Sequence, residues 1–151
     1  ARVAPDRKVS IEREIFPALV RDRSVYALGS DALWTDMGTP ENYLEANLAW
    51  AAREGSLVEG GGAVRDGVHP RASVRNSVLG AGTAVAEDAV VEGSVLLNGA
   101  RVMAGALVRG SVVGPDAEVG PKAVVEELTV LGQGYRVGAG EVVSGQRLPP
   151  A

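Results

Sequence analysis

The sequence predicts a mainly β protein, in which a coil of short parallel strands follows a short α/β segment. Three observations support this fold class. A three-residue pattern recurs every 17 residues in the second part of the chain, and branched aliphatic residues recur every six within each unit. Composition also changes: 18 of the 20 Gly lie between Gly55 and Gly145, whereas five of the six aromatic residues lie in the first fifty. The change near residues 53–60 predicts two domains, residues 1–54 and residues 55–147.

The 17-residue repeat is visible in a triplet of one hydroxyl residue and two aliphatic residues. With one residue added near Leu128, its copies are Ser77-Val78-Leu79, Ser94-Val95-Leu96, Ser111-Val112-Val113 and Thr129-Val130-Leu131. The period of six runs through Leu79, Val85 and Val91 in one unit and through the equivalent aliphatic residues in the later units. Small residues follow the aliphatic ones at a fixed distance of four, as in Thr83, Ala89, Ala100, Ala106, Ala117 and Ala123.

This pattern indicates a three-sided coil in which a large residue points inward on each side and a small residue fits near each corner. Gly, Asn and Asp fill the intervening places, as corners with positive φ require. A single coil cannot bury its inner face, so successive coils must stack. At a strand spacing of about 4.8 Å, four to five coils make a rod roughly 20–25 Å long.

The first part of the chain contains signals for a helix and two short strands. A helix is expected over Val9–Asp22, capped by Ser10 and ended or bent at Pro17. Short strands are expected at Val25–Leu28 and Ala32–Trp34. These elements are too few for an independent α/β core, because so small a sheet leaves open edges. The segment is therefore interpreted as the last part of a larger domain.

A second helix is predicted between this segment and the repeat. Thr39 suits the N-cap, Pro40 suits the first helical position, and the helix is expected to run to about Arg53 and stop at Gly55. Leu44, Leu48 and Ala52 recur at the spacing of an apolar helix face, and Tyr43 and Ala51 widen that face.

Composition excludes several classes of protein. The net charge of −4 and pI of about 5.0 disfavour a nucleic-acid surface, which needs clustered Lys and Arg. Uncharged stretches are far shorter than the roughly 18 residues of a membrane helix, so no membrane association is expected. There is no Cys, which excludes disulfides and thiolate metal sites and fits a cytoplasmic location. The single His, His69, excludes sites built from several His ligands in one chain.

The repeat over residues 60–145 resembles the hexapeptide repeat of left-handed parallel β-helix proteins, and this resemblance implies the handedness. Two segments before it carry a second resemblance. They are Val9-Ser10-Ile11-Glu12-Arg13-Glu14-Ile15-Phe16-Pro17 and Trp34-Thr35-Asp36-Met37-Gly38-Thr39-Pro40-Glu41-Asn42-Tyr43-Leu44. Both are similar to the C-terminal part of the catalytic domain of sugar-nucleotide pyrophosphorylases, and most similar to the mannose-1-phosphate guanylyltransferase family. In that family a nucleotidyltransferase domain precedes a left-handed β-helix.

The resemblance implies a reaction that joins a nucleoside triphosphate to a sugar 1-phosphate and releases pyrophosphate. It implies Mg²⁺ as cofactor, held in part by Asp36, the aspartate of the family's segment before the helix. On the residues alone, the interpretation of Asp36 as the cap of a turn or of the following helix is favoured over that of a metal ligand. Trp34 is expected to pack in a core. Glu12, Arg13 and Glu14 belong to the similar segment, but no role is assigned to them.

This chain departs from the family pattern in three places. The glycine-rich nucleotide loop, the first metal aspartate and the Glu-Lys-Pro segment associated with the sugar phosphate are absent and would precede residue 1. Gly60-Gly61-Gly62 is interpreted as a linker. No catalytic or nucleotide-binding residue is therefore assigned in this chain. Both substrates are expected to bind the missing N-terminal part, and the isolated chain is expected to be inactive.

Other functions remain open at this point. A β-helix acyltransferase would need His69 as general base, but this residue follows the inward-facing Val68 in an irregular coil, a position that faces solvent. A non-catalytic assembly or regulatory module is the second alternative, because the repeat holds no catalytic constellation. In either case a homo-oligomer formed through the β-helix is expected. Within the family, glucose with another nucleotide remains an alternative to mannose with GTP.

Overall fold

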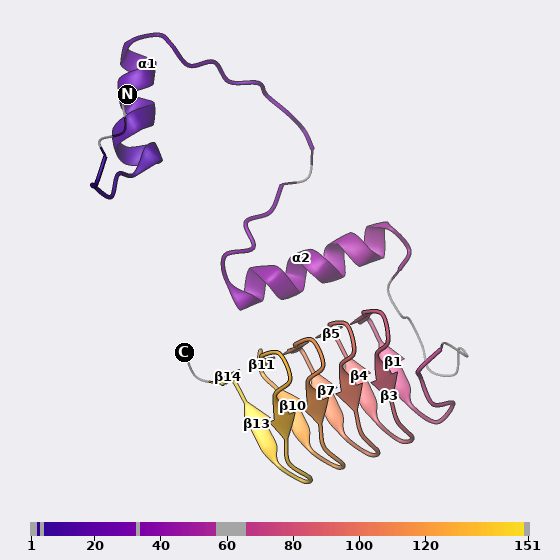
Figure 1. Cartoon of the computed structure of the whole chain (residues 1–151). Helices are drawn as coiled ribbons and strands as arrows, with labels where there is room; N and C mark the ends of the chain where they lie inside the picture. The colour runs from indigo at the N-terminus through magenta and orange to yellow at the C-terminus, as the bar shows by residue number, and fades with distance from the viewer. Residues whose placement is uncertain (1–2, 4, 33, 57–65, 150–151) are drawn as a thin grey trace. The chain divides into compact units, whose positions relative to one another are not determined.

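The computed structural model describes residues 3, 5–32, 34–56 and 66–149. The chain divides into two compact units, residues 1–34 and residues 35–151. The second unit contains helix α2 (Pro40–Arg53) and a stack of three-sided coils (Figure 1).

Three parallel sheets form the sides of the stack. Sheet 1 has the order β1-β4-β7-β10-β13, sheet 2 the order β2-β5-β8-β11-β14, and sheet 3 the order β3-β6-β9-β12. The strands are β1 (Ser73–Arg75), β2 (Val78–Leu79), β3 (Ala84–Val85), β4 (Val90–Glu92), β5 (Val95–Leu96), β6 (Arg101–Val102), β7 (Leu107–Arg109), β8 (Val112–Val113), β9 (Glu118–Val119), β10 (Val124–Glu126), β11 (Val130–Leu131), β12 (Arg136–Val137), β13 (Val142–Ser144) and β14 (Arg147–Leu148).

The register of the sheets follows the repeat. Ser73 pairs with Val90 in sheet 1, and Val78 pairs with Val95 in sheet 2, each 17 residues away. Sheets of five, five and four strands confirm the predicted mainly β fold of four to five coils. This β-solenoid is consistent with the left-handed β-helix that the family resemblance implies.

The core runs along the axis of the stack and consists of the residues that the repeat predicts. The inward aliphatic residues are buried: Val74, Leu79, Val85, Val91, Leu96, Val102, Val108, Val113, Val119, Val125, Leu131, Val137 and Val143. The small corner residues are buried as well: Ala72, Thr83, Ala89, Ala100, Ala106, Ala117 and Ala123. Because each inward residue packs on its equivalent in the adjacent coils, burial depends on stacking.

The corners need special backbone conformations. Asn76, Asp88 and Asp116 have φ values of 44°, 57° and 55°, in the left-handed region that Asn and Asp tolerate. Gly114 serves a different purpose, because a Cβ there would overlap the backbone carbonyl of Leu131 in the next coil. The predicted use of Gly, Asn and Asp at corners is confirmed at these positions, and Lys122, Glu127 and Leu128 also have positive φ.

A column of buried hydroxyl groups connects successive coils. Ser77, Ser94, Ser111 and Thr129 are fully buried, one in each unit. The Ser94 hydroxyl donates to the carbonyl of Glu92 at 2.7 Å and accepts from the backbone N–H of Ser111 at 3.1 Å. Ser77 and Thr129 likewise bond one carbonyl of their own coil and one N–H of the next, groups that a corner would otherwise bury without partners. The Ser111 hydroxyl donates to the carbonyl of Arg109, and the N–H of Thr129 in the next coil bonds to the carbonyl of Glu126.

Removing one of these hydroxyls is expected to destabilise the stack. Ser94→Ala leaves the N–H of Ser111 buried without an acceptor, so the free energy of unfolding should fall by about 1–3 kcal/mol. Urea denaturation of the chain measures this. Ser73→Ala is the matched control, since the Ser73 side chain is only partly buried, and it should change stability by less than about 0.5 kcal/mol. Equal effects of the two substitutions would contradict a role for the hydroxyl column.

Helix α2 packs across the outer face of sheet 2 (Figure 1). Leu44 is buried against Val95 and Val112, and Tyr43 and Leu48 are partly buried in the same cluster. The predicted limits are confirmed: the Thr39 hydroxyl accepts from the N–H of Asn42 at 3.3 Å, and the helix ends before Gly55, whose φ is 65°. Ala51, part of the predicted apolar face, is buried, whereas Ala52, which was also expected to face inward, is exposed.

The first unit contains the predicted helix in two parts. A π-helical turn, η1 (Ile11–Ile15), leads into helix α1 (Phe16–Arg21), and Pro17 lies in the first turn of α1 rather than at its end. The Ser10 hydroxyl accepts from the N–H of Arg13 at 3.2 Å, as expected of an N-cap. Hydrogen bonds from the Arg7 guanidinium and from the Ser10 backbone lower the pKa of Glu14.

The expected strand at Val25–Leu28 is not formed. Tyr26 and Leu28 are exposed, and no described residue pairs with this segment. A strand exists only by hydrogen bonding to a neighbour, which explains the difference. In the second expected strand, Ala32 and Trp34 have no strand conformation and Leu33 lies outside the described residues, as does the expected linker at residues 60–62. None of the described helices is both long and apolar enough to cross a lipid bilayer.

Candidate functional site

Asp36 lies in the exposed turn that leads into helix α2. Its Oδ1 accepts a hydrogen bond from the N–H of Gly38 at 3.0 Å, so the carboxylate closes this turn. Within the described part of the chain, no hydrogen bond or ion pair involves its second oxygen, Oδ2. The turn function and a metal-binding function are therefore compatible, because Oδ1 closes the turn and Oδ2 could bind a metal ion.

The beginning of helix α2 keeps this turn in place. Glu41 follows Thr39 and Pro40, and its carboxylate accepts hydrogen bonds from its own backbone N–H and from the Thr39 hydroxyl. These bonds lower the pKa of Glu41, with a smaller contribution from the charge of Arg147 in β14. The turn is thus linked to the helix by the capping bond from Asn42 to Thr39.

A groove of about 400 Å³ lies beside the turn, between the residues that follow Asp36 and sheet 2. Met37, Gly38 and Pro40 line one side, and Val112, Pro115 and Gln133 are among the residues on the other. Sequence reasoning missed this groove, because it depends on how helix α2 packs against the β-helix. The residues that directly follow Asp36 therefore lie opposite sheet 2 across this groove.

The described residues match a Mg²⁺ site only in part. Mg²⁺ is usually held by one or two carboxylates together with phosphate oxygens and water. Asp36 can supply one carboxylate, but the described residues contain no group of three potential ligands from His, Cys, Asp and Glu. The assignment of Asp36 as a metal ligand stays a prediction, and a complete site would need ligands from outside these residues.

Trp34 does not pack in a core as expected. Its side chain is 83% exposed, and the described residues around it form no apolar cluster that includes it. The expectation rested on the apolar character of the side chain, but burial also requires neighbouring elements to pack against it.

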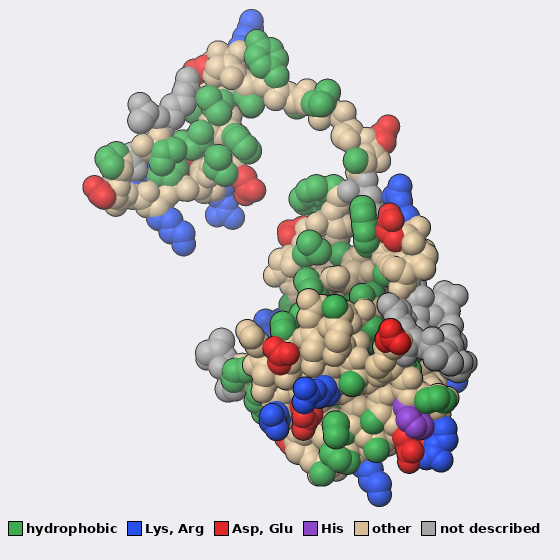
Figure 2. All heavy atoms as spheres, turned by 45° about the vertical axis from the view of Figure 1, so that its right-hand side comes forward, with side chains coloured by type: hydrophobic (Ala, Val, Ile, Leu, Met, Phe, Trp, Pro, Cys, Tyr) green, Lys and Arg blue, Asp and Glu red, His purple; other side chains and the backbone are tan. Residues whose placement is uncertain are grey.

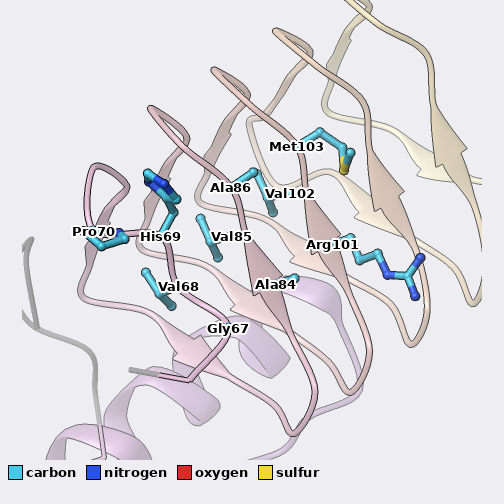
Figure 3. A pocket seen from close by; sticks show the side chains of 10 residues that line it. All are labelled: Gly67, Val68, His69, Pro70, Ala84, Val85, Ala86, Arg101, Val102 and Met103. Atoms are coloured by element: carbon cyan, nitrogen blue, oxygen red, sulfur yellow. The ribbon is translucent and has the colours of Figure 1, made fainter. Parts of the chain in front are cut away.

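His69 lies on the outside of the first coil, at the edge of a second groove of about 460 Å³ (Figure 3). Its Nδ1 accepts from the N–H of Arg71 at 3.2 Å, and its Nε2 lies 3.9 Å from Oε2 of Glu87. Figure 3 shows the short side chain of Ala86 between His69 and Met103. His69 therefore faces outward, as the sequence predicted, and has polar partners that fix its ring.

Charged side chains are dispersed over the surface. On the face shown in Figure 2, acidic and basic groups alternate over the β-helix rather than forming a patch of one sign. Several are paired, for example Arg71 with Asp88 at 3.2 Å. Such a surface is typical of a solvated face, without the basic cluster that phosphate backbones require.

The stacked coils, the six-residue period of inward aliphatic residues and the buried hydroxyl column define a β-helix protein of the hexapeptide-repeat class. Residues 65–151 match the family model described as GMPPB C-terminal domain, and because this match covers more than half of the chain, the chain belongs to that family.

Relatives from several organisms have similar sequences. A mannose-1-phosphate guanylyltransferase of Mycobacterium tuberculosis is 33% identical over 148 residues, which cover 94% of this chain and 33% of the relative. A mannose-1-phosphate guanyltransferase of Hypocrea jecorina is 31% identical over 180 residues, covering 95% of this chain and 44% of the relative. This chain therefore spans between a third and a half of the length of these two proteins.

A solved structure, the serine acetyltransferase 1 of Entamoeba histolytica, matches with 18% identity and a TM-score of 0.27 over 55% of this chain and 38% of that one. A similarity at this level carries no argument about activity.

Proposed function

We propose that this chain is the C-terminal part of a sugar-1-phosphate nucleotidyltransferase that makes GDP-mannose from GTP and mannose 1-phosphate and releases pyrophosphate. One observation carries the proposal. The similarity to a mannose-1-phosphate guanylyltransferase covers 94% of the chain, so it includes the segment before the β-helix as well as the β-helix itself.

The proposed chemistry gives this chain a supporting role. A phosphate oxygen of the sugar 1-phosphate attacks the α-phosphorus of the nucleotide, and negative charge develops during the attack. Mg²⁺, when bound, would neutralise part of that charge. Asp36 would hold the ion from its turn, and helix α2 and sheet 2 would keep the turn in position. Binding of the nucleotide and the sugar phosphate is assigned to residues N-terminal to this chain.

The β-helix is proposed to join subunits into a homo-oligomer and to pack against the catalytic domain. Its repeat is used for inward packing and corner hydrogen bonds, and its surface holds no cluster of catalytic groups among the described residues. A cytoplasmic location is proposed with it, in keeping with a chain that contains no Cys.

The test is an assay of pyrophosphate release by the full-length polypeptide that carries this chain. We expect release with GTP and mannose 1-phosphate, and none from residues 1–151 alone. The same assay with glucose 1-phosphate and each of the other nucleoside triphosphates tests the choice of substrate. Faster release with one of those pairs would replace GTP and mannose 1-phosphate in the proposal, and absence of release with every pair would refute nucleotidyl transfer.

A further inference from the structure

The outer face of sheet 1 carries a row of outward side chains, four of the five aliphatic, that no described element of the second unit covers. Ser73, Val90, Leu107, Val124 and Val142 lie in register, each beside the next across the five strands. Val142 is 63% exposed, the other aliphatic members are partly exposed, and none belongs to a hydrophobic cluster of the described residues. This row is called the sheet 1 strip below.

The other two sheets show what such a row means in this fold. In sheet 2 the equivalent position is also aliphatic, and helix α2 covers it, leaving Val95 and Val112 buried. In sheet 3 the equivalent position becomes charged after the first strand, with exposed Arg101 and Arg136 and partly exposed Glu118. An aliphatic outward row therefore marks a covered face in sheet 2 and is absent from the solvated face of sheet 3. Sheet 1 therefore has the outward residues of a covered face, but no described element of the second unit covers it.

A row of alternating charge runs beside the sheet 1 strip. Arg75, Glu92, Arg109 and Glu126 follow one another across successive strands. Arg109 Nε lies 3.4 Å from Glu92 Oε2, and its NH1 lies 3.9 Å from Glu126 Oε2. Among the described residues, Arg75 has no acidic partner within ion-pair distance. The row is therefore partly paired within the chain and keeps an unpaired cation at one end.

Read in the opposite direction, this row has the opposite charge at every position, so it can pair with a reversed copy of itself. When two copies of sheet 1 face each other across a two-fold axis that lies along the strands, the order of coils in one copy is reversed relative to the other. With the axis between β4 and β7, Arg75 faces Glu126 and Glu92 faces Arg109, each pair formed twice. The same register places Val90 opposite Leu107 in the strip. With the axis on β7 instead, Glu92 would face Glu126 and Arg109 would face itself.

From this complementarity we propose that sheet 1 is a homodimer face, on which a second copy of the chain packs with the axis between β4 and β7. The inference rests on the assembly role in the proposed function and specifies its surface. Five strands about 4.8 Å apart make a small face, well below the roughly 800 Å² per partner of standard interfaces. The contact should therefore be concentration-dependent, and charge pairing should decide its register.

Charge-reversed variants of the 151-residue chain test the register. Glu92→Arg and Arg109→Glu each place two like-charged pairs across the axis, so sedimentation equilibrium should give at least about a tenfold weaker dimer for each. An equimolar mixture of the two variants should dimerise with an affinity close to that of the unaltered chain, because each mutated side chain then faces an opposite charge. The ion pair between positions 92 and 109 is lost within both variant chains, so recovery in the mixture can only arise between chains.

Glu118→Arg is the matched control. Glu118 lies on sheet 3 and is 4.0 Å from Arg136, so this substitution also reverses an acidic residue and breaks an ion pair within the chain. It should leave the dimer affinity unchanged. All measurements are made at low salt, about 50 mM, where screening is weak.

The outcomes separate this inference from the proposed function. A monomer at all concentrations up to about 1 mM overturns both the sheet 1 contact and the assembly role. An oligomer that responds equally to Glu92→Arg and Glu118→Arg, or a mixture that fails to recover, overturns the sheet 1 contact and leaves the assembly role standing. Pyrophosphate release is measured separately and does not depend on either result.

Discussion

Replacing Asp36 by Asn in the full-length polypeptide is expected to reduce pyrophosphate release about a hundredfold or more. Asn keeps an acceptor oxygen for the N–H of Gly38, so the turn before helix α2 is retained. What is lost is the negative charge that a Mg²⁺ ligand supplies, and lost charge stabilisation in phosphoryl transfer costs two to three orders of magnitude in rate. The turnover number and the Mg²⁺ concentration for half-maximal rate are measured together, and the latter should rise.

Two further variants distinguish the metal-binding function of Asp36 from its turn function. Asp36→Ala removes both, so it should be inactive and should also begin to unfold at a lower temperature. Asp31→Asn removes an exposed carboxylate five positions earlier and should leave the rate unchanged. If Asp36→Asn keeps the normal rate and only Asp36→Ala has an effect, Asp36 serves the turn alone and is no metal ligand.

The repeat could be predicted from the sequence because every coil must bury its inward side chains between the same kinds of neighbours. A residue such as Val91 packs between Val74 and Val108 of the adjacent coils and must be similar to them in size and polarity. The structural repeat is therefore visible as a repeat in the sequence. The second helix could be predicted for a local reason, since Thr39, Pro40 and Gly55 determine its ends without reference to other elements.

The site was less predictable because it depends on contacts between elements. The groove beside Asp36 exists only because Leu44 packs on Val95 and Val112, and nothing local in residues 36–44 indicates that contact. One signal was available: Val78 and Val130, like Val95 and Val112, are aliphatic although they point outward, which marks sheet 2 as a covered face. The strand predicted at residues 25–28 is not confirmed, because β-propensity alone does not supply a hydrogen-bonding neighbour and none of the described residues pairs with this segment.

Replacing Val108 by Asp is expected to unfold the β-helix. Val108 is fully buried in the middle of the stack, paired with Val91 in one adjacent coil and Val125 in the other. A carboxylate there has no partner and no route to water that leaves both coil contacts intact. The cost, several kcal/mol, is comparable to the 5–15 kcal/mol that typically stabilises a domain. The circular dichroism of the β-structure should therefore be lost, or its melting temperature should fall by more than about 10 °C.

Val142→Asp tests whether position or residue type decides this effect. Val142 is also a strand valine of sheet 1, but it points outward and is 63% exposed, so its change to Asp should alter stability by less than about 0.5 kcal/mol. Val108→Ala should fall between the two, at about 2 kcal/mol, because it removes buried methyl groups without adding a charge. The stability losses are expected in this order only if the coils share one continuous core. Similar melting temperatures for Val108→Asp and Val142→Asp would mean that the inward column does not hold the stack together.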